Sequence, residues 1–200
     1  MLRYQRGMDD RPYHHGDLRV ALLAAAETEL AERGIEAFSL RAVAKRAGVS
    51  HAAPAHHFGD ANGLLTALAG EGYSRFLATQ RQREAQAAPD ARAQLIASGL
   101  GYVDFALARP ALFRLMFGSN RTDYAHPDLY AGAEAAYVHL RDLTAAAGGA
   151  GPGDMAAVWA TAHGLADLLA AGRLKMLDGL TPVDRDAAIV GIISRALPGG

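Results

Sequence analysis

The sequence contains no cysteine among its 200 residues. That absence excludes disulfide bonds and catalysis by a thiol. The chain also has no apolar run of 18 residues, the length that a membrane-spanning helix requires, and nothing in it resembles a secretory signal. We therefore expect a cytoplasmic protein that does not cross a membrane.

Motifs of common hydrolases and metal enzymes are missing as well. There is no His-Glu-x-x-His, Glu-x-x-His or Gly-x-Ser-x-Gly pattern. The glycine-rich stretch 148–153 lacks the lysine of a phosphate-binding loop, so we interpret it as a linker. His14 and His15 are adjacent, but no third ligand clusters with them. We expect a protein that is not an enzyme, with no catalytic residue, cofactor or bound metal.

The net charge is −1, from 20 basic and 21 acidic residues. An overall basic surface is therefore absent, and any affinity for nucleic acid has to come from a local patch. Half of the residues are hydrophobic, as in ordinary globular proteins. Apolar residues recur at helical spacing along the chain, so the expected fold class is all-α.

The stretch 39–58 has the pattern of a helix-turn-helix. Ser39 is suited to cap a helix, and the apolar residues after it fall at i, i+3, i+4 and i+7. Gly48 follows, where a helix ends in a left-handed residue. Ser50 offers a second cap, and the pattern predicts a second short helix from His51. Two short helices joined by a glycine turn describe a helix-turn-helix.

The charges of this stretch suit a polyanion. It holds three basic residues, Arg41, Lys45 and Arg46, and no acidic one. Its second helix carries three histidines, whose imidazoles offer a donor and an acceptor to base edges. An ordinary helix pair with a solvated basic face has the same spacing, so the pattern alone leaves that alternative open.

The runs 43–50, 56–58 and 63–65 resemble the DNA-binding domain of TetR-family transcription regulators. The resemblance extends over residues 13–70 and implies a first helix from Asp17 to Arg33. On this basis we predict that double-stranded DNA is the partner. Ser39, Arg41 and Lys45 would hold phosphates, and bases would be faced by His51, Ala52, Ala53 and His56, with Ser50 and His57 in the same interface.

Two positions depart from the family pattern. This chain has Ala55 where the family usually has an aromatic residue, and Ala61 where it usually has a lysine. By the resemblance both are phosphate contacts, so their loss weakens sequence-independent affinity or shifts it to other residues. A helical scaffold or ligand-binding protein with weak or lost DNA binding is the alternative. Pro54, at about the fourth helical position, predicts a distorted helix start.

We predict three segments: a flexible basic arm over 1–16, a DNA-binding domain over 17–65, and an effector-binding and dimerisation domain over 66–200. A disordered tail without a role is the alternative for the arm. The apolar pattern and the breaks between periodic segments predict further helices over 60–86, 90–109, 110–117, 128–147, 154–177 and 182–197.

The segment Trp159 to Gly164 is similar to the Trp…His-Gly signature of one C-terminal ligand-binding class of this family. The domain also has more aromatic residues than a small helical core needs, which predicts a cavity for a small, largely apolar effector. The predicted contacts are Tyr102, Phe105, Phe113, Met116, Phe117, Tyr137, Trp159 and His163. The alternatives are that Met and Phe are plain core, and that His163 is a hydrogen-bonded core residue.

The last two predicted helices are apolar on two faces, and a helix of this kind is buried on both. One face meets its own domain and the other needs a partner, so we predict a homodimer interface containing Val158, Leu165, Leu169, Ile189 and Ile193. A monomer whose other helices cover both faces is the alternative. The sequence therefore predicts a ligand-responsive DNA-binding regulator, a repressor that binds a palindromic operator as a dimer.

Overall fold

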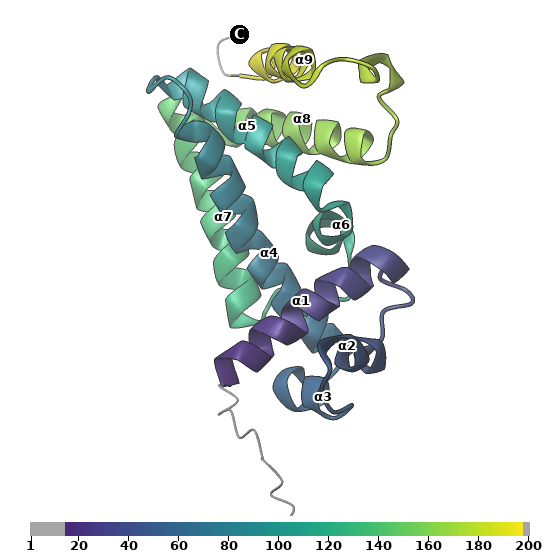
Figure 1. Ribbon diagram of the computed structural model, residues 1–200. Helices are drawn as coiled ribbons and strands as arrows, with labels where there is room; N and C mark the ends of the chain where they lie inside the picture. Colours follow the sequence, from purple (N-terminus) through teal and green to yellow (C-terminus); the bar gives the residue numbers. More distant parts are fainter. Residues whose placement is uncertain (1–14, 198–200) are drawn as a thin grey trace, which may run out of the picture.

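The computed structural model describes residues 15–197, which form nine α-helices and one turn of 3-10 helix, with no strand in this part of the chain. This confirms the predicted all-α class (Figure 1). The elements are α1 (His15–Arg33), α2 (Leu40–Ala47), α3 (Ala53–Phe58), α4 (Ala61–Glu84), α5 (Ala91–Ala108), α6 (Pro110–Gly118), α7 (Pro127–Ala146), α8 (Pro152–Ala170), η1 (Lys175–Leu177) and α9 (Pro182–Ser194).

The first three helices and the start of α4 surround a small core. Leu22, Ala26 and Leu30, four residues apart on α1, are fully or almost fully buried. They pack with Phe38 and Val43, which come from the turn after α1 and from α2. The predicted stripe of the first helix is therefore the face that holds this bundle together. The predicted arm over 1–16 falls almost entirely outside the described residues.

Helix α4 connects this bundle to the larger C-terminal one. In Figure 1 it rises from beside α3 to the opposite end of the molecule, with α7 running along it. Helices α5 and α8 pack against each other, and α9 lies against both of them at the end farthest from α3. One continuous helix therefore belongs to both bundles, with Leu64 buried in one and Phe76 in the other.

Gly101 allows the close crossing of α4 and α5. A Cβ atom at this position would lie 2.5 Å from the Cα of Gln80 and 2.9 Å from the carbonyl oxygen of Thr79. Both are backbone atoms of α4, so they cannot move without shifting the whole helix. Gly101→Ala is expected to lower the free energy of unfolding by about 1–3 kcal/mol or more, because it overpacks the crossing. Urea denaturation followed by circular dichroism measures the change.

Gly153→Ala is the matched control for this change. Gly153 is also helical, but an added Cβ there would meet no atom of the described residues within 4 Å. Alanine has the better helix propensity, so the control should be neutral or slightly stabilising. Equal losses in the two variants would show that the α4–α5 contact is not the cause.

The C-terminal helices are shorter than the periodicity predicts. Helix α8 ends at Ala170 rather than at residue 177, because Gly172 adopts a left-handed conformation with a φ of 64°. Glycine reverses the chain there at little cost, and the residues that follow form the separate turn η1. Helix α9 ends at Ser194, three residues before the predicted end.

Candidate nucleic-acid interface and ligand cavity

The turn between α2 and α3 has the geometry that the sequence pattern predicts. Ser39 caps α2, and its hydroxyl oxygen accepts a hydrogen bond from the N–H of Ala42 at 3.5 Å. Gly48 has a φ of 69°, and its N–H points back to the last carbonyls of α2. The Ser39 hydroxyl keeps its own proton, which it can donate to a phosphate oxygen.

The second helix begins later than predicted. His51 and Ala52 lie in the turn, and α3 starts at Ala53. Pro54 therefore lies in the first turn of the helix, where its missing N–H has no intrahelical partner to lose. The prediction that Pro54 distorts the helix is wrong, since Pro54 is buried at a position suited to proline.

The predicted DNA contacts lie on the surface of this unit. Six of the nine are exposed, and the other three are half-buried: the exposed residues are Arg41, Lys45, Ser50, His51, Ala52 and His56, and the half-buried ones are Ser39, Ala53 and His57. Of the two departures from the family pattern, Ala55 is exposed, and Ala61, the first residue of α4, is half-buried.

The positive charge of Arg46 is offset by two glutamates of α1. Its guanidinium turns toward α1 and donates hydrogen bonds to Glu29 at 3.2 Å and to Glu32 at 2.5 Å. These hydrogen bonds raise the pKa of Arg46 above its ordinary value. On α2, Arg41 and Lys45 remain available to contact a polyanion. They are two of the three basic residues in the stretch 39–58.

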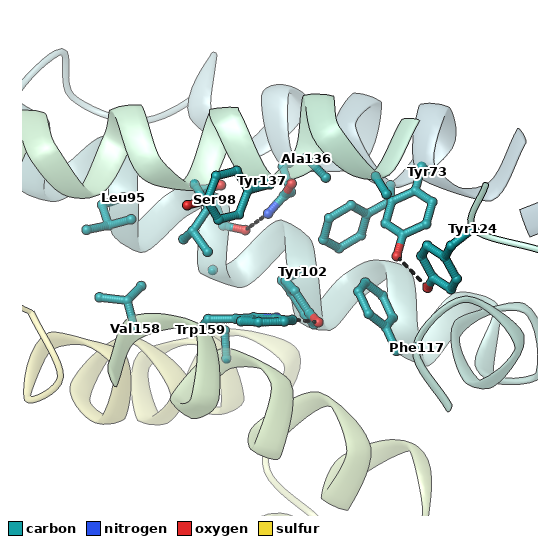
Figure 2. Close-up of a pocket in the computed structure, with 16 residues that line it drawn as sticks. Tyr73, Leu95, Ser98, Tyr102, Phe117, Tyr124, Ala136, Tyr137, Val158 and Trp159 are labelled. Carbon is teal, nitrogen blue, oxygen red and sulfur yellow. Dashed lines mark hydrogen bonds between the residues drawn. The ribbon is translucent and has the colours of Figure 1, made fainter. Parts of the chain in front are cut away.

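A cavity of about 320 Å³ lies in the C-terminal bundle. Figure 2 shows Tyr137 of α7 and Trp159 of α8 on opposite sides of it, with α5 behind. Most of its wall is apolar or aromatic, which is typical of a small-molecule site. It is lined by Tyr73, Phe76, Gln80, Leu95, Ser98, Gly99, Tyr102, Phe117, Tyr124, Ala133, Ala136, Tyr137, Leu140, Val158, Trp159 and Ala162.

One group of polar atoms at the cavity wall centres on Tyr102. Its hydroxyl lies 2.8 Å from Nδ1 of His163 and accepts a hydrogen bond from Nε1 of Trp159 at 3.4 Å. Burial raises the pKa of Tyr102 and lowers the pKa of His163, so the phenol stays protonated and the imidazole neutral near pH 7. The group is therefore an uncharged hydrogen-bonding site.

A second polar group lies where Tyr73 meets Tyr124, drawn as a dashed line in Figure 2. The two hydroxyl oxygens are 3.2 Å apart, and that of Tyr124 also donates to the carbonyl of Met116. Burial raises the pKa of Tyr73, so this phenol also stays protonated. Among the described residues, no charged side chain lines the cavity.

The structure brings half of the predicted effector contacts to the cavity. Tyr102, Phe117, Tyr137 and Trp159 line it, and His163 stands behind Tyr102. The other three are buried elsewhere in the aromatic core and are not part of the lining: Phe105, Phe113 and Met116. A helical spacing of aromatic residues does not distinguish a cavity wall from the core directly behind it.

Four polar residues of the lining are not among the contacts predicted from the sequence: Tyr73, Gln80, Ser98 and Tyr124. Gln80 and Ser98 are more than nine-tenths buried, and the Gln80 amide donates to the backbone carbonyl of Ser98 at 3.4 Å. A polar residue on an otherwise apolar helix face is the signal that marks such positions. Tyr124 has no such signal, because it lies in a polar loop.

Most of the predicted dimer contacts are buried inside the protomer rather than exposed at its surface. Four of them are buried in the protomer's own core and the fifth is half-buried: Val158, Leu165, Ile189 and Ile193, and Leu169. Side chains that their own chain already covers cannot form the surface that a partner covers. The structure corrects the prediction for these residues, because they face the core of their own protomer rather than its surface.

Two further findings concern the described residues as a whole. No three histidine, aspartate or glutamate side chains among them gather closely enough to hold a metal ion. None of the helices in the same part of the chain combines the length and apolarity needed to span a bilayer.

Solved structures with this arrangement of helices include a protein of unknown function from Rhodococcus sp. RHA1. It is 38% identical, covers 94% of this chain and 99% of its own, and has a TM-score of 0.74. A TetR-like transcriptional regulator from Rhodococcus sp. RHA1 is 16% identical over 94% and 99% of the two chains, with a TM-score of 0.66.

A third structure is the TetR-like transcriptional regulator LfrR from Mycobacterium smegmatis, solved in complex with proflavine. It is 20% identical, over 91% of this chain and 97% of its own, with a TM-score of 0.61. Curated proteins give no match.

Two family models match the chain. Residues 22–68 match bacterial regulatory proteins of the tetR family, and residues 95–193 match the tetracyclin repressor-like C-terminal domain. Neither description names the Trp-His-Gly class, so that assignment stays a prediction. The matches cover both helical bundles, and the chain belongs to the TetR family of bacterial transcription regulators.

Proposed function

We propose that this regulator is a cytoplasmic repressor that binds a palindromic operator as a homodimer and is released by a small, largely apolar effector. One observation carries the proposal: α4 starts directly after the DNA-binding helices and supplies Tyr73, Phe76 and Gln80 to the cavity wall. A ligand in the cavity therefore contacts the same helix that supports α3. Such a ligand releases DNA only if it binds one arrangement of the two bundles better than the other.

For the DNA contacts, we propose that α2 positions the protein and the start of α3 distinguishes sequences. Arg41 and Lys45 are exposed and cationic, which suits contacts to phosphates. His51 and His56 are exposed on the turn and on α3, where a recognition helix presents its first residues to base edges in the major groove.

Lys45→Ala and His56→Ala should therefore have different effects. Loss of Lys45 should weaken binding to every sequence about equally and reduce the salt slope by roughly one per protomer. Loss of His56 should change the preference between operator variants, by about 1–3 kcal/mol at the base it faces. Fluorescence anisotropy across salt concentrations and single-base operator variants measures both effects.

Lys175→Ala provides a matched control, because Lys175 is an exposed lysine of η1 at the other end of the molecule. It should leave both the affinity and the salt slope unchanged. If the two test variants shift specificity in the same way, the division of roles between α2 and α3 is wrong.

The proposed dimer forms through the outward faces of α8 and α9. Small residues follow one another along the exposed side of α8, at Ala157, Ala160 and Gly164, and Leu168 continues this row. An added Cβ on Gly164 would meet no atom of residues 15–197 within 4 Å, so contacts within this part of the protomer do not explain a mid-helix glycine. Small side chains allow two helices to approach closely, and a two-fold pair of such faces gives a closed dimer.

The proposed effector is uncharged and mostly apolar. Within the described part of the chain, the cavity wall carries phenols, an indole, an amide and a hydroxyl, and no carboxylate or ammonium group that would offset a ligand's charge. LfrR, a relative of the same fold, was solved with the small molecule proflavine. That complex supports small-molecule binding by the fold. The chemistry of the proposed effector follows from the residues that line the cavity of this chain.

Selection of bound sequences from a genomic fragment library, followed by footprinting, tests the proposal. The expected result is a near-palindromic site whose two halves are protected symmetrically. The two recognition helices would then enter major grooves roughly 34–36 Å apart. Protection without two-fold symmetry would contradict the dimer arrangement. A protein that selects no sequence at any salt concentration would instead be the alternative, a helical scaffold or ligand-binding protein, which the alanines at positions 55 and 61 favour.

A further inference from the structure

The loop between α6 and α7, residues 119–126, contacts the cavity at one point. At another it contacts the DNA-binding bundle, which consists of α1, α2, α3 and the start of α4. We propose that it is a second connection between the two sites, beside α4. In this proposal Tyr124 senses occupancy of the cavity, and Arg121 is the positioning residue that holds the DNA-binding bundle. The inference rests on the proposed function, because it names the parts that regulate it.

The cavity end of the connection is Tyr124. Its ring lines the cavity, and its hydroxyl is held by Tyr73 at 3.2 Å and by the carbonyl of Met116. Met116 belongs to α6 and Tyr73 to α4, so the two bonds tie the loop to two helices of the cavity wall. A ligand that takes a hydrogen bond from Tyr73, or needs the space beside it, competes with the bond that fixes Tyr124.

The DNA-binding end is Arg121, only three residues earlier. Its Nη1 donates to the backbone carbonyl of Ile35 at 2.5 Å, and its Nε donates to Oδ1 of Asn62 at 3.0 Å. Ile35 lies in the turn between α1 and α2, and Asn62 lies in the first turn of α4, four residues after Phe58 ends α3. One guanidinium therefore holds both flanks of the helix-turn-helix.

Between these ends, hydrogen bonds hold the backbone of the loop. The N–H of Arg121 donates to the hydroxyl of Ser119 at 3.1 Å, and the N–H of Asp123 donates to the hydroxyl of Thr66 at 3.0 Å. Asp123 in turn accepts from the N–H of Ala125 at 2.9 Å. Local bonds on both sides of Tyr124 mean that a displacement of its ring moves the backbone that carries Arg121, rather than being absorbed between them.

The choice of arginine fits this role. A guanidinium is planar and presents several N–H groups in fixed directions, so it can donate to two acceptors at once. A lysine at the same position keeps the charge but is a point donor on a flexible stem. Arg121→Lys therefore separates the geometry of the contact from its charge.

The first test is a double-mutant cycle on operator affinity without any ligand. Arg121→Ala should lower the affinity at least roughly fivefold, because the bundle loses its fixed orientation. Arg121→Lys should recover only part of this loss. Tyr124→Phe keeps the ring and removes both hydroxyl bonds, and it should also lower the affinity. If both residues act through one connection, the double variant should match Arg121→Ala within about twofold.

Arg114→Ala is the matched control. Arg114 is an exposed arginine of α6, so this variant removes the same charge close to the loop but outside it. It should bind the operator like the wild type. Circular dichroism checks that each variant folds, and Arg121→Gln, which keeps one donating group, replaces Arg121→Ala if that variant does not.

The second test measures coupling with N-phenyl-1-naphthylamine, an uncharged aromatic probe whose emission reports entry into an apolar cavity. Arg121→Ala should bind the probe within about twofold of the wild type, because Arg121 does not line the cavity. The ratio of operator affinities with and without saturating probe should fall from the roughly 5- to 150-fold range of an allosteric pair toward one. A residue with only a structural role would change both affinities and leave their ratio intact.

The outcomes separate the two proposals. A wild-type protein that binds no DNA overturns the proposed function, and this inference with it. A wild-type protein that binds its operator, with Arg121→Ala and Tyr124→Phe binding like Arg114→Ala, overturns the loop connection alone. Additive effects of Arg121→Ala and Tyr124→Phe in the ligand-free cycle overturn it as well, because they show two independent sites.

Discussion

Replacing Ala160 by arginine is expected to convert the proposed dimer to a monomer and to remove specific operator binding. Ala160 is exposed on α8, between Ala157 and Gly164 on the face that we propose for the dimer. Two arginines would meet near the two-fold axis, where neither their bulk nor their charge finds a partner. A monomer reads one half-site, so the operator affinity should fall by at least roughly 10³-fold, toward the non-specific range.

Sedimentation equilibrium and operator titrations measure the two effects. Ala78→Arg, at an exposed alanine of α4, is the matched control and should remain dimeric. Val158→Ala provides the contrast, because Val158 is buried in its own protomer: it should cost stability without changing the oligomeric state. A dimeric Ala160→Arg protein with normal operator binding would place the interface elsewhere.

Trp159→Ala is expected to remove most of the response to an effector while leaving ligand-free operator binding nearly intact. The indole is a large part of the cavity wall and donates to the hydroxyl of Tyr102. Loss of the indole opens the cavity wall and removes aromatic contact area, so a ligand binds the cavity with a less favourable free energy. A coupling of about 1–3 kcal/mol, or some 5- to 150-fold in operator affinity, should shrink accordingly.

Operator titrations with and without ligand measure the response of both proteins, and in the wild type the emission of Trp159, the only tryptophan, reports ligands that enter the cavity. Tyr130→Ala is the matched control: Tyr130 is an exposed aromatic residue of α7 outside the lining, and its loss should leave the response unchanged. Ligands that release DNA without changing Trp159 emission, and that also act on the Trp159→Ala protein, would show that the effector binds elsewhere.

Local chemistry accounts for most of the fold. The stripe of α1 and the Ser39 cap with the Gly48 turn depend on neighbours in sequence, so periodicity and residue type place them. The same approach failed at α3, because it took Ser50 as the cap. A proline in the first helical turn proved the stronger constraint, and the helix starts at Ala53.

The cavity and the outer surfaces depend on packing, which periodicity does not fix. A helix that is apolar on two sides gives no indication of which side faces inward. On α8, Val158 and Leu165 face inward while Ala160 and Leu168 face outward, a division that the apolar character of these residues does not predict. Tyr124 lies beyond any local pattern, because a loop residue reaches the cavity only through the way α6 and α7 are joined.

The composition of the cavity wall also determines which signals the protein ignores. Among the described residues, the lining has no histidine, carboxylate or amine, and histidine is the side chain that ordinarily titrates near neutrality. His163 stands behind the wall, where burial lowers its pKa and so favours the neutral imidazole. A fall in pH would therefore leave the charge of the cavity wall unchanged, and the affinity of the cavity for an uncharged ligand would not depend on the pH at which the ligand arrives.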